Sequence, residues 1–146
     1  MASSPATLLI VDDEPQVRKL LETLLHHEGY VTQSACCGEE ALRLVAQQPP
    51  DLILLDIMMP GMDGYEVASQ LKGNPATANI PIIMLSALSD ASARVSGLET
   101  GAEEFISKPI ERVELWLRVR NLLRLKAHGD ELKKHSIMLE QQLHAD

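Results

Sequence analysis

The sequence predicts a doubly wound α/β fold, in which helices cover both faces of one parallel sheet. Short apolar runs without alternation recur along the chain, as expected of strands that are buried on both faces. Segments of helical length and apolar period lie between these runs, and glycines and prolines separate the two kinds of segment. Strand and helix alternate five times, which is the pattern of a doubly wound sheet.

Five strands are predicted. Apolar runs at residues 8–11, 52–55, 82–85 and 105–106 give the four clearer strands, and a weaker strand fits residues 30–35.

Four helices are predicted between the strands, over residues 15–28, 39–48, 65–72 and 90–100. Pro15 stands where the first turn of a helix tolerates proline. The first helix has an apolar stripe formed by Val17, Leu20, Leu21, Leu24 and Leu25.

From Glu111 onward the helical pattern runs further than a fifth covering helix requires. Leu115, Val119 and Leu122 are expected to face the sheet. An imperfect heptad seam then continues through Leu122, Leu125, Leu132, Leu139 and Leu143.

The chain therefore divides into a domain over residues 1–126 and a helical linker or coiled-coil extension over residues 127–146. Gly129 interrupts the extension, because glycine costs about 1 kcal/mol of helix propensity.

Length and composition exclude several classes of protein. A chain of 146 residues holds one ordinary core, and no apolar run approaches the roughly 18 residues of a membrane helix. The start of the chain lacks the basic and apolar stretches of a secretory signal, so we expect a cytoplasmic protein with no membrane partner. Residues 1–111 hold 6 Lys/Arg against 16 Asp/Glu, and this acidic charge argues against direct binding of nucleic acid.

The only two cysteines, Cys36 and Cys37, are adjacent. Neighbouring cysteines cannot link distant segments, and in a reducing compartment we interpret them as small, mostly inert residues.

Polar residues follow four of the five predicted strands. Asp12 and Asp13 follow the first strand, Asp56 the third, Ser86 the fourth, and Lys108 comes shortly after the fifth. The carboxyl ends of parallel strands form one edge of a sheet, so these side chains should converge. Three carboxylates repel one another and need a cation, and an all-oxygen donor set favours Mg²⁺ over zinc. A carboxylate can also attack phosphorus and form an aspartyl phosphate, with the metal and a lysine neutralising charge on the transferring oxygens.

These residues lie in four motifs: Val11-Asp12-Asp13-Glu14, Leu55-Asp56-Ile57-Met58-Met59-Pro60-Gly61-Met62-Asp63-Gly64, Leu85-Ser86-Ala87 and Ser107-Lys108-Pro109. In combination they make residues 6–126 resemble the receiver domain of bacterial two-component response regulators, the CheY-like family. The resemblance implies a flavodoxin-like fold, with strand order 2-1-3-4-5 and five flanking helices.

The resemblance also implies chemistry. Asp56 would accept a phosphoryl group from a sensor histidine kinase or a phosphotransfer protein. Mg²⁺ would be held by Asp12, Asp13, Asp56 and the backbone carbonyl of Met58. We expect no enzyme activity beyond self-catalysed phosphoryl transfer to Asp56 and slow autodephosphorylation.

Three further roles come with the resemblance. Ser86 and Lys108 would bind phosphoryl oxygens. Phe105 stands at the position of the switch aromatic, three residues before the lysine, and the peptide bond before Pro109 would be cis, as in the family.

The residues two positions after Asp56 and after Ser86 flank the path of the hydrolytic water in receiver domains. Here they are Met58 and Leu88, and neither can orient water by hydrogen bonding. The expectation is a comparatively long-lived phosphoryl aspartate.

Other interpretations of these residues stay open. Asp63 is expected to shape a turn or cap the next helix. The sequence argues against two others: a phosphatase with an aspartyl nucleophile needs a general acid where Met58 stands, and a flavodoxin-like cofactor binder needs a phosphate-cradling loop where Asp12 and Asp13 stand. The nearer alternatives are a phosphorylation-independent pseudo-receiver, which usually lacks one of the acids or the lysine, and a single-domain phosphate shuttle.

The output is predicted from the C-terminal part of the chain. Phosphorylation would shift the face formed by the fourth helix, fifth strand and fifth helix. Trp116 and Leu123 lie off the stripe that faces the sheet, which favours a homodimer through this face and the C-terminal helix, although partial burial of Trp116 in the core fits equally well. Residues 118–126 and 139–142 resemble the linker to cyclic-di-GMP output domains of the HD-GYP or GGDEF type, so the output domain would lie C-terminal to this chain.

Overall fold

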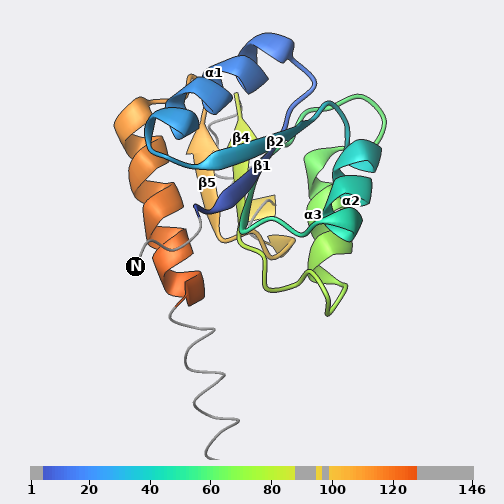
Figure 1. The fold of residues 1–146 in the computed structure, drawn as a ribbon. Coiled ribbons are helices and arrows are strands. Elements are labelled where there is room, and N and C mark those ends of the chain that lie inside the picture. The colour runs from blue at the N-terminus through green and yellow to red at the C-terminus, as the bar shows by residue number, and fades with distance from the viewer. Residues whose placement is uncertain (1–4, 88–94, 97–98, 128–146) are drawn as a thin grey trace, which may run out of the picture.

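Five parallel strands form one sheet in the order β2-β1-β3-β4-β5 (Figure 1). The fold is described from a computed structural model, which places residues 5–87, 95–96 and 99–127. The strands are β1 (Thr7–Val11), β2 (Val31–Ala35), β3 (Leu52–Asp56), β4 (Ile82–Ser86) and β5 (Glu104–Ser107). All five predicted strands and the predicted strand order are confirmed.

Helices lie on both faces of the sheet, as the fold class requires (Figure 1). They are α1 (Pro15–His27), α2 (Gly38–Gln47), α3 (Gly64–Lys72) and a helix described over residues 112–127, which we call the C-terminal helix. Most of the predicted helix over residues 90–100 and nearly all of the predicted extension over residues 127–146 lie outside the described residues. None of the helices within the described residues is long and apolar enough to cross a membrane.

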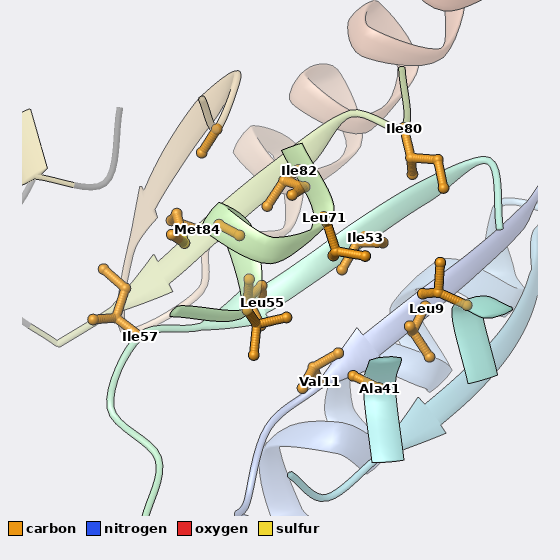
Figure 2. Packing of buried hydrophobic residues seen from close by; sticks show 14 of the residues in the cluster. Leu9, Val11, Ala41, Ile53, Leu55, Ile57, Leu71, Ile80, Ile82 and Met84 are labelled. Carbon is orange, nitrogen blue, oxygen red and sulfur yellow. The ribbon is translucent and has the colours of Figure 1, made fainter. Parts of the chain in front are cut away.

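The two faces of the sheet bury alternate residues of each strand. On one face Leu9 and Val11 of β1 belong to a cluster with residues of α2 and α3, part of which is shown in Figure 2. On the other face Leu8 and Ile10 belong to a cluster with α1 and the C-terminal helix. A strand covered on both sides needs apolar residues at every position, which explains the continuous apolar runs in the sequence.

The predicted apolar stripes of the helices are mostly buried. Leu115, Val119 and Leu122 of the C-terminal helix pack in the second cluster, as predicted. Leu20 of α1 departs from the prediction, because it is 47% exposed while Leu21 and Leu25 are fully buried. The contact stripe of α1 is therefore narrower than the periodicity predicts.

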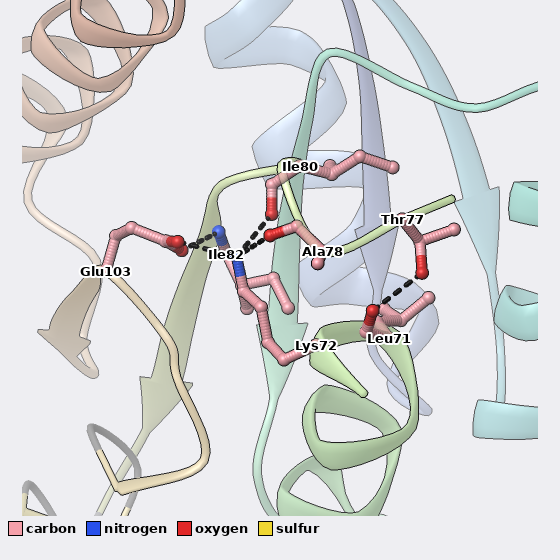
Figure 3. Close-up of polar contacts among 7 residues, drawn as sticks. All are labelled: Leu71, Lys72, Thr77, Ala78, Ile80, Ile82 and Glu103. Carbon is pink, nitrogen blue, oxygen red and sulfur yellow. Dashed lines mark hydrogen bonds and ion pairs between the residues drawn. The ribbon is translucent and has the colours of Figure 1, made fainter. Parts of the chain in front are cut away.

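Lys72 fastens the end of α3 to the amino ends of two strands (Figure 3). Its ammonium group donates to the carbonyl oxygens of Ala78 and Ile80 and forms an ion pair with Glu103. The other carboxylate oxygen of Glu103 accepts the backbone N–H of Ile82, the first residue of β4. All three donors of Lys72 are thereby used at the edge of the sheet opposite the carboxyl ends.

We expect Lys72→Met to lower the free energy of unfolding by about 2–3 kcal/mol, because it leaves two carbonyls and the Glu103 carboxylate without their donor. Chemical denaturation measures this directly. Lys19→Met, at an exposed position of α1, is the control and should change stability by less than about 0.5 kcal/mol. Equal effects of the two substitutions would contradict the role given to Lys72.

Candidate functional site

Three carboxylates meet at the carboxyl edge of the sheet. Asp12 directly follows β1, Asp13 comes next, and Asp56 is the last residue of β3. Each offers an oxygen within 4.8 Å of the others. Asp12 and Asp56 are buried, whereas Asp13 is the more exposed of the three, so the cluster opens to solvent on one side.

Lys108 reaches into this cluster from the loop after β5. Its Nζ lies 3.0 Å from Oδ2 of Asp12 and 3.3 Å from Oδ1 of Asp56. The lysine therefore bridges two buried carboxylates that stand 96 and 52 positions earlier in the sequence. A buried carboxylate is stabilised by such a charged partner and is costly without one.

Asp12 is held in place by the chain around it. Its side chain accepts the backbone N–H of Glu14 at 2.9 Å, and its carbonyl oxygen accepts a hydrogen bond from Arg18 of α1 at 2.7 Å. Its own N–H donates to the carbonyl of Ala35 at the end of β2. The contribution of Arg18 was not predicted, because an arginine on a helix gives no local sign that it turns back to a carbonyl.

The charges of the cluster oppose one another. The pKa of Asp56 is raised to about 6, because burial and the Asp12 carboxylate raise it more than Lys108 and the backbone N–H of Met58 lower it. Burial by itself would lower the pKa of Lys108, but its contacts with Asp12 and Asp56 outweigh this, and the pKa is raised. Lys108 thus stays cationic, and the cluster still carries excess negative charge.

Ser86 ends β4 at the same edge and is buried. Its register partner on β5 is Ser107, and its carbonyl oxygen accepts the backbone N–H of Lys108 at 2.7 Å. The peptide bond between Lys108 and Pro109 is cis, as predicted. These contacts place Ser86 on the strand next to Asp56, and Lys108 directly after β5, the next strand along the sheet.

The start of α3 lies directly against the end of β3, next to Asp56. A Cβ at Gly64 would stand 2.3 Å from the carbonyl oxygen of Asp56, so only glycine lets the start of α3 approach β3 this closely. Asp63 caps α3 by accepting the N–H of Glu66, which confirms the predicted capping role. Met58, within the loop between β3 and α3, is 61% exposed.

Phe105 lies in the core rather than at the surface. It is 4% exposed, pairs with Met84 across the sheet and belongs to the cluster on the α2 and α3 face. Leu88, which is predicted to tune hydrolysis, lies outside the described residues.

Trp116 packs against α1. Its indole N–H donates to the carbonyl of Leu24, its ring stacks on His27 at 6.3 Å between centroids, and the Arg112 guanidinium lies 4.8 Å from its centroid. Leu123 is partly buried against the core on the same side. Both residues have partners within the chain, so their predicted place in a dimer interface stays a prediction.

The acidic cluster fits a hard divalent cation. Its donors are all carboxylate oxygens, they converge from two strand ends, and their repulsion is only partly offset by one lysine. Mg²⁺ prefers oxygen ligands and is usually bound through a few carboxylates with water at the remaining positions. The open side at Asp13 leaves room for that water.

Comparisons with known proteins agree with this geometry. The chain matches the response regulator receiver domain family over residues 8–120. It is 46% identical over 129 residues to the response regulator PleD of Caulobacter vibrioides, covering 88% of this chain and 28% of that protein. It is 38% identical over 134 residues to the DNA-binding dual master transcriptional regulator RpaA of Synechocystis, covering 92% of this chain and 56% of that protein.

Solved structures give the same result. The receiver domain of a signal transduction histidine kinase from Syntrophus aciditrophicus superposes with a TM-score of 0.77 at 42% identity, covering 82% of this chain and 90% of that one. The receiver domain of a Francisella response regulator gives a TM-score of 0.77 at 32% identity, covering 82% and 97%. The chain spans about half or less of the length of the two curated relatives.

We expect Asp56→Asn to stabilise the metal-free protein, because it removes one of the buried like charges while keeping the side-chain shape. The melting temperature in a chelator should rise by about 2–5 °C, which corresponds to on the order of 1 kcal/mol for a domain of this size. Thermal unfolding measures this, and Asp63→Asn is the matched control, because asparagine caps a helix as well as aspartate does. A lower melting temperature for Asp56→Asn would contradict the repulsion described here.

Proposed function

Because the chain belongs to the response regulator receiver domain family, whose members act in two-component signalling, we propose that Asp56 is the residue that accepts the phosphoryl group. The observation that carries this proposal is the shared contact of Lys108 with Asp12 and Asp56 at the carboxyl edge of the sheet. This contact brings together a carboxylate that can accept the phosphoryl group, a second carboxylate that can bind a cation, and an ammonium group that can bind phosphoryl oxygens.

The transfer is a displacement at phosphorus. An Oδ of Asp56 attacks the phosphorus of a phosphohistidine on the kinase or phosphotransfer partner, the new O–P bond forms, and the P–N bond breaks. The imidazole leaves with the bonding electron pair and takes a proton from solvent. The backbone N–H of Met58 keeps the attacking carboxylate oriented, and Lys108 lies where it can exchange its contact with Asp56 for one with a phosphoryl oxygen.

Mg²⁺ is the cofactor that this site would take. We propose Asp12, Asp13, Asp56 and the backbone carbonyl of Met58 as its protein ligands. Bound there, the ion would neutralise charge on the phosphoryl oxygens as the bond to the donor weakens.

Ser86 and Phe105 would report phosphorylation to the rest of the domain. The Ser86 hydroxyl stands at the end of β4, one strand away from Asp56, and in this proposal it donates a hydrogen bond to a phosphoryl oxygen. Phe105 has no hydroxyl and is already buried, so apolar packing alone would hold it inward after β4 shifts. The shift would favour one of two arrangements of the face that includes β5 and the C-terminal helix.

The output remains a proposal. The curated relatives extend well beyond the part that this chain matches, and RpaA is named a DNA-binding regulator. We propose that the receiver controls an output domain C-terminal to it, by homodimerisation through the C-terminal helix and its neighbours. A cyclic-di-GMP output domain remains the prediction of the linker sequence. The pseudo-receiver alternative is less well supported, because the chain has the two acids proposed to bind the metal, the acceptor aspartate and the lysine.

Phosphorylation of Asp56 can be tested by intact mass. After incubation with Mg²⁺ and a small phosphodonor, we expect one phosphoryl adduct on the wild-type chain and on Asp63→Asn, and none on Asp56→Asn. Light scattering on the same samples tests whether the adduct changes the oligomeric mass. An adduct that persists on Asp56→Asn would refute the assignment, and no adduct on the wild type would favour the pseudo-receiver.

Slow hydrolysis of the phosphoryl aspartate is expected from Met58 and Leu88. The double variant Met58→Asn, Leu88→Glu supplies groups that orient water, so its phosphoryl half-life should be shorter by about tenfold. The half-life is measured by intact mass at intervals after the donor is removed. Leu125→Asn, at an exposed position of the C-terminal helix, should leave it unchanged. A double variant with the wild-type half-life would show that polarity at these two positions does not matter.

A further inference from the structure

A second group of metal-binding side chains lies in the loop between β2 and α2. Cys36 and Cys37 follow β2, and Glu40 stands in the first turn of α2. Each offers one ligand atom within 4.8 Å of the other two. The Cys36 thiol donates to a carboxylate oxygen of Glu40 at 3.4 Å. None of these residues takes part in the phosphoryl chemistry described above.

We propose that Cys36, Cys37 and Glu40 form a binding site for one thiophilic divalent metal ion of the Zn²⁺ class. Zinc binds thiolate sulfur at about 2.3 Å and carboxylate oxygen at about 2.0–2.2 Å, so two sulfurs on a tetrahedral ion lie about 3.8 Å apart. In the structure the three ligand atoms lie within 4.8 Å of one another, so shifts of about 1 Å or less would bring the two sulfurs to that spacing.

The chemistry of the donors separates this site from the acidic cluster. Two sulfurs and one carboxylate favour zinc or a similar soft ion over Mg²⁺, whereas three carboxylates favour Mg²⁺. The domain would thus hold two ions of different classes at one edge of the sheet. The two sites are joined by the backbone, because Ala35, the residue before Cys36, accepts the N–H of Asp12.

The side chain of Cys37 does not cap α2. Cys37 is the N-cap residue of α2, a position where serine, threonine, aspartate or asparagine would cap the helix, and its side chain makes no capping hydrogen bond. Both cysteines are free thiols. The capping role therefore does not compete with metal binding for the Cys37 sulfur.

The net charge of the metal-bound site is favourable at the amino end of α2. Two thiolates, one carboxylate and a divalent ion together carry one negative charge, and the amino end of a helix favours negative charge. Among the described residues, no lysine, arginine or histidine forms an ion pair with Glu40 that a metal would have to displace. Cys36 is exposed, while Cys37 and Glu40 are half-buried, so water can occupy the fourth position.

The same contacts argue against a redox nucleophile. The hydrogen bond and charge of Glu40 raise the pKa of the Cys36 thiol, whereas a reactive cysteine needs a stabilised thiolate. A bound cation would offset the repulsion between the Cys36 thiolate and the Glu40 carboxylate, because it attracts both.

The test is a titration of the reduced full chain with Co²⁺ as a probe and with Zn²⁺ in competition. Excess Mg²⁺ is added to fill the acidic cluster, so that Co²⁺ does not bind there. We expect one Co²⁺ per chain with a near-ultraviolet thiolate-to-metal charge-transfer band, and loss of the band when Zn²⁺ is added. Cys36→Ser and Cys37→Ser should each halve the band and weaken binding at least tenfold.

Glu40→Gln and Glu39→Gln are the matched pair for the carboxylate. Both remove one charge from the same helical turn, but Glu39 is exposed and outside the group of ligands. Glu40→Gln should weaken binding about tenfold and keep the charge-transfer band at saturation, while Glu39→Gln should leave the affinity within about twofold of the wild type. Zn²⁺ should also raise the melting temperature of the wild type, and raise that of Cys37→Ser by less at the same concentration.

Binding without a charge-transfer band, or with the same affinity after both cysteines are replaced by serine, would place the ion on histidines or on the acidic cluster and overturn the proposal. Equal loss of affinity in Glu39→Gln and Glu40→Gln would overturn the assignment of Glu40 as a ligand.

Discussion

The contact of Lys108 with two buried carboxylates is the interaction on which the rest of the site depends. Asp12 and Asp56 stand at the ends of neighbouring strands, buried and close enough to repel each other, and the Lys108 ammonium group lies 3.0 and 3.3 Å from their oxygens. A single positive charge does not neutralise them and Asp13, so the site keeps a net attraction for a divalent cation. In the proposed function, the same imbalance would let a phosphoryl group enter once a cation is bound, because Lys108 would move its contact to the incoming oxygens.

The fold places these polar groups at the ends of the strands, outside the apolar core. Alternate residues of β1 and β3 point to opposite helical layers, and the polar residues begin only where the strands reach the carboxyl edge. Gly64 lets α3 start directly against the end of β3, and Arg18 of α1 fixes the carbonyl of Asp12. At the opposite edge Lys72 and Glu103 close the amino ends of the strands. Side-chain contacts therefore stabilise both edges of the sheet, and the polar site residues lie at the carboxyl edge.

Much of this could be predicted from the sequence, and the exceptions have physical reasons. The strands buried on both faces gave continuous apolar runs, whereas β2 is an edge strand with a mostly half-buried pattern and gave a weak signal. The convergence of Asp12, Asp56 and Ser86 followed from the rule that parallel strands end at one edge. Two features could not be predicted from a local pattern: the return of Arg18 to a backbone carbonyl and the packing of Trp116 on α1. A third feature, the approach of Glu40 to two cysteines, was also not predicted. The four-residue spacing from Cys36 to Glu40 at a helix start was the available signal for the last of these.

The most direct measurement of the central claim is a calorimetric Mg²⁺ titration of the wild type, Lys108→Met and Asp13→Asn. If the carboxylates hold the cation and Lys108 competes with it for them, the wild type binds one Mg²⁺, Lys108→Met binds it more tightly, and Asp13→Asn binds it at least about tenfold more weakly. Wild-type affinity in Asp13→Asn, or a loss of binding in Lys108→Met, would contradict the balance of charges described here.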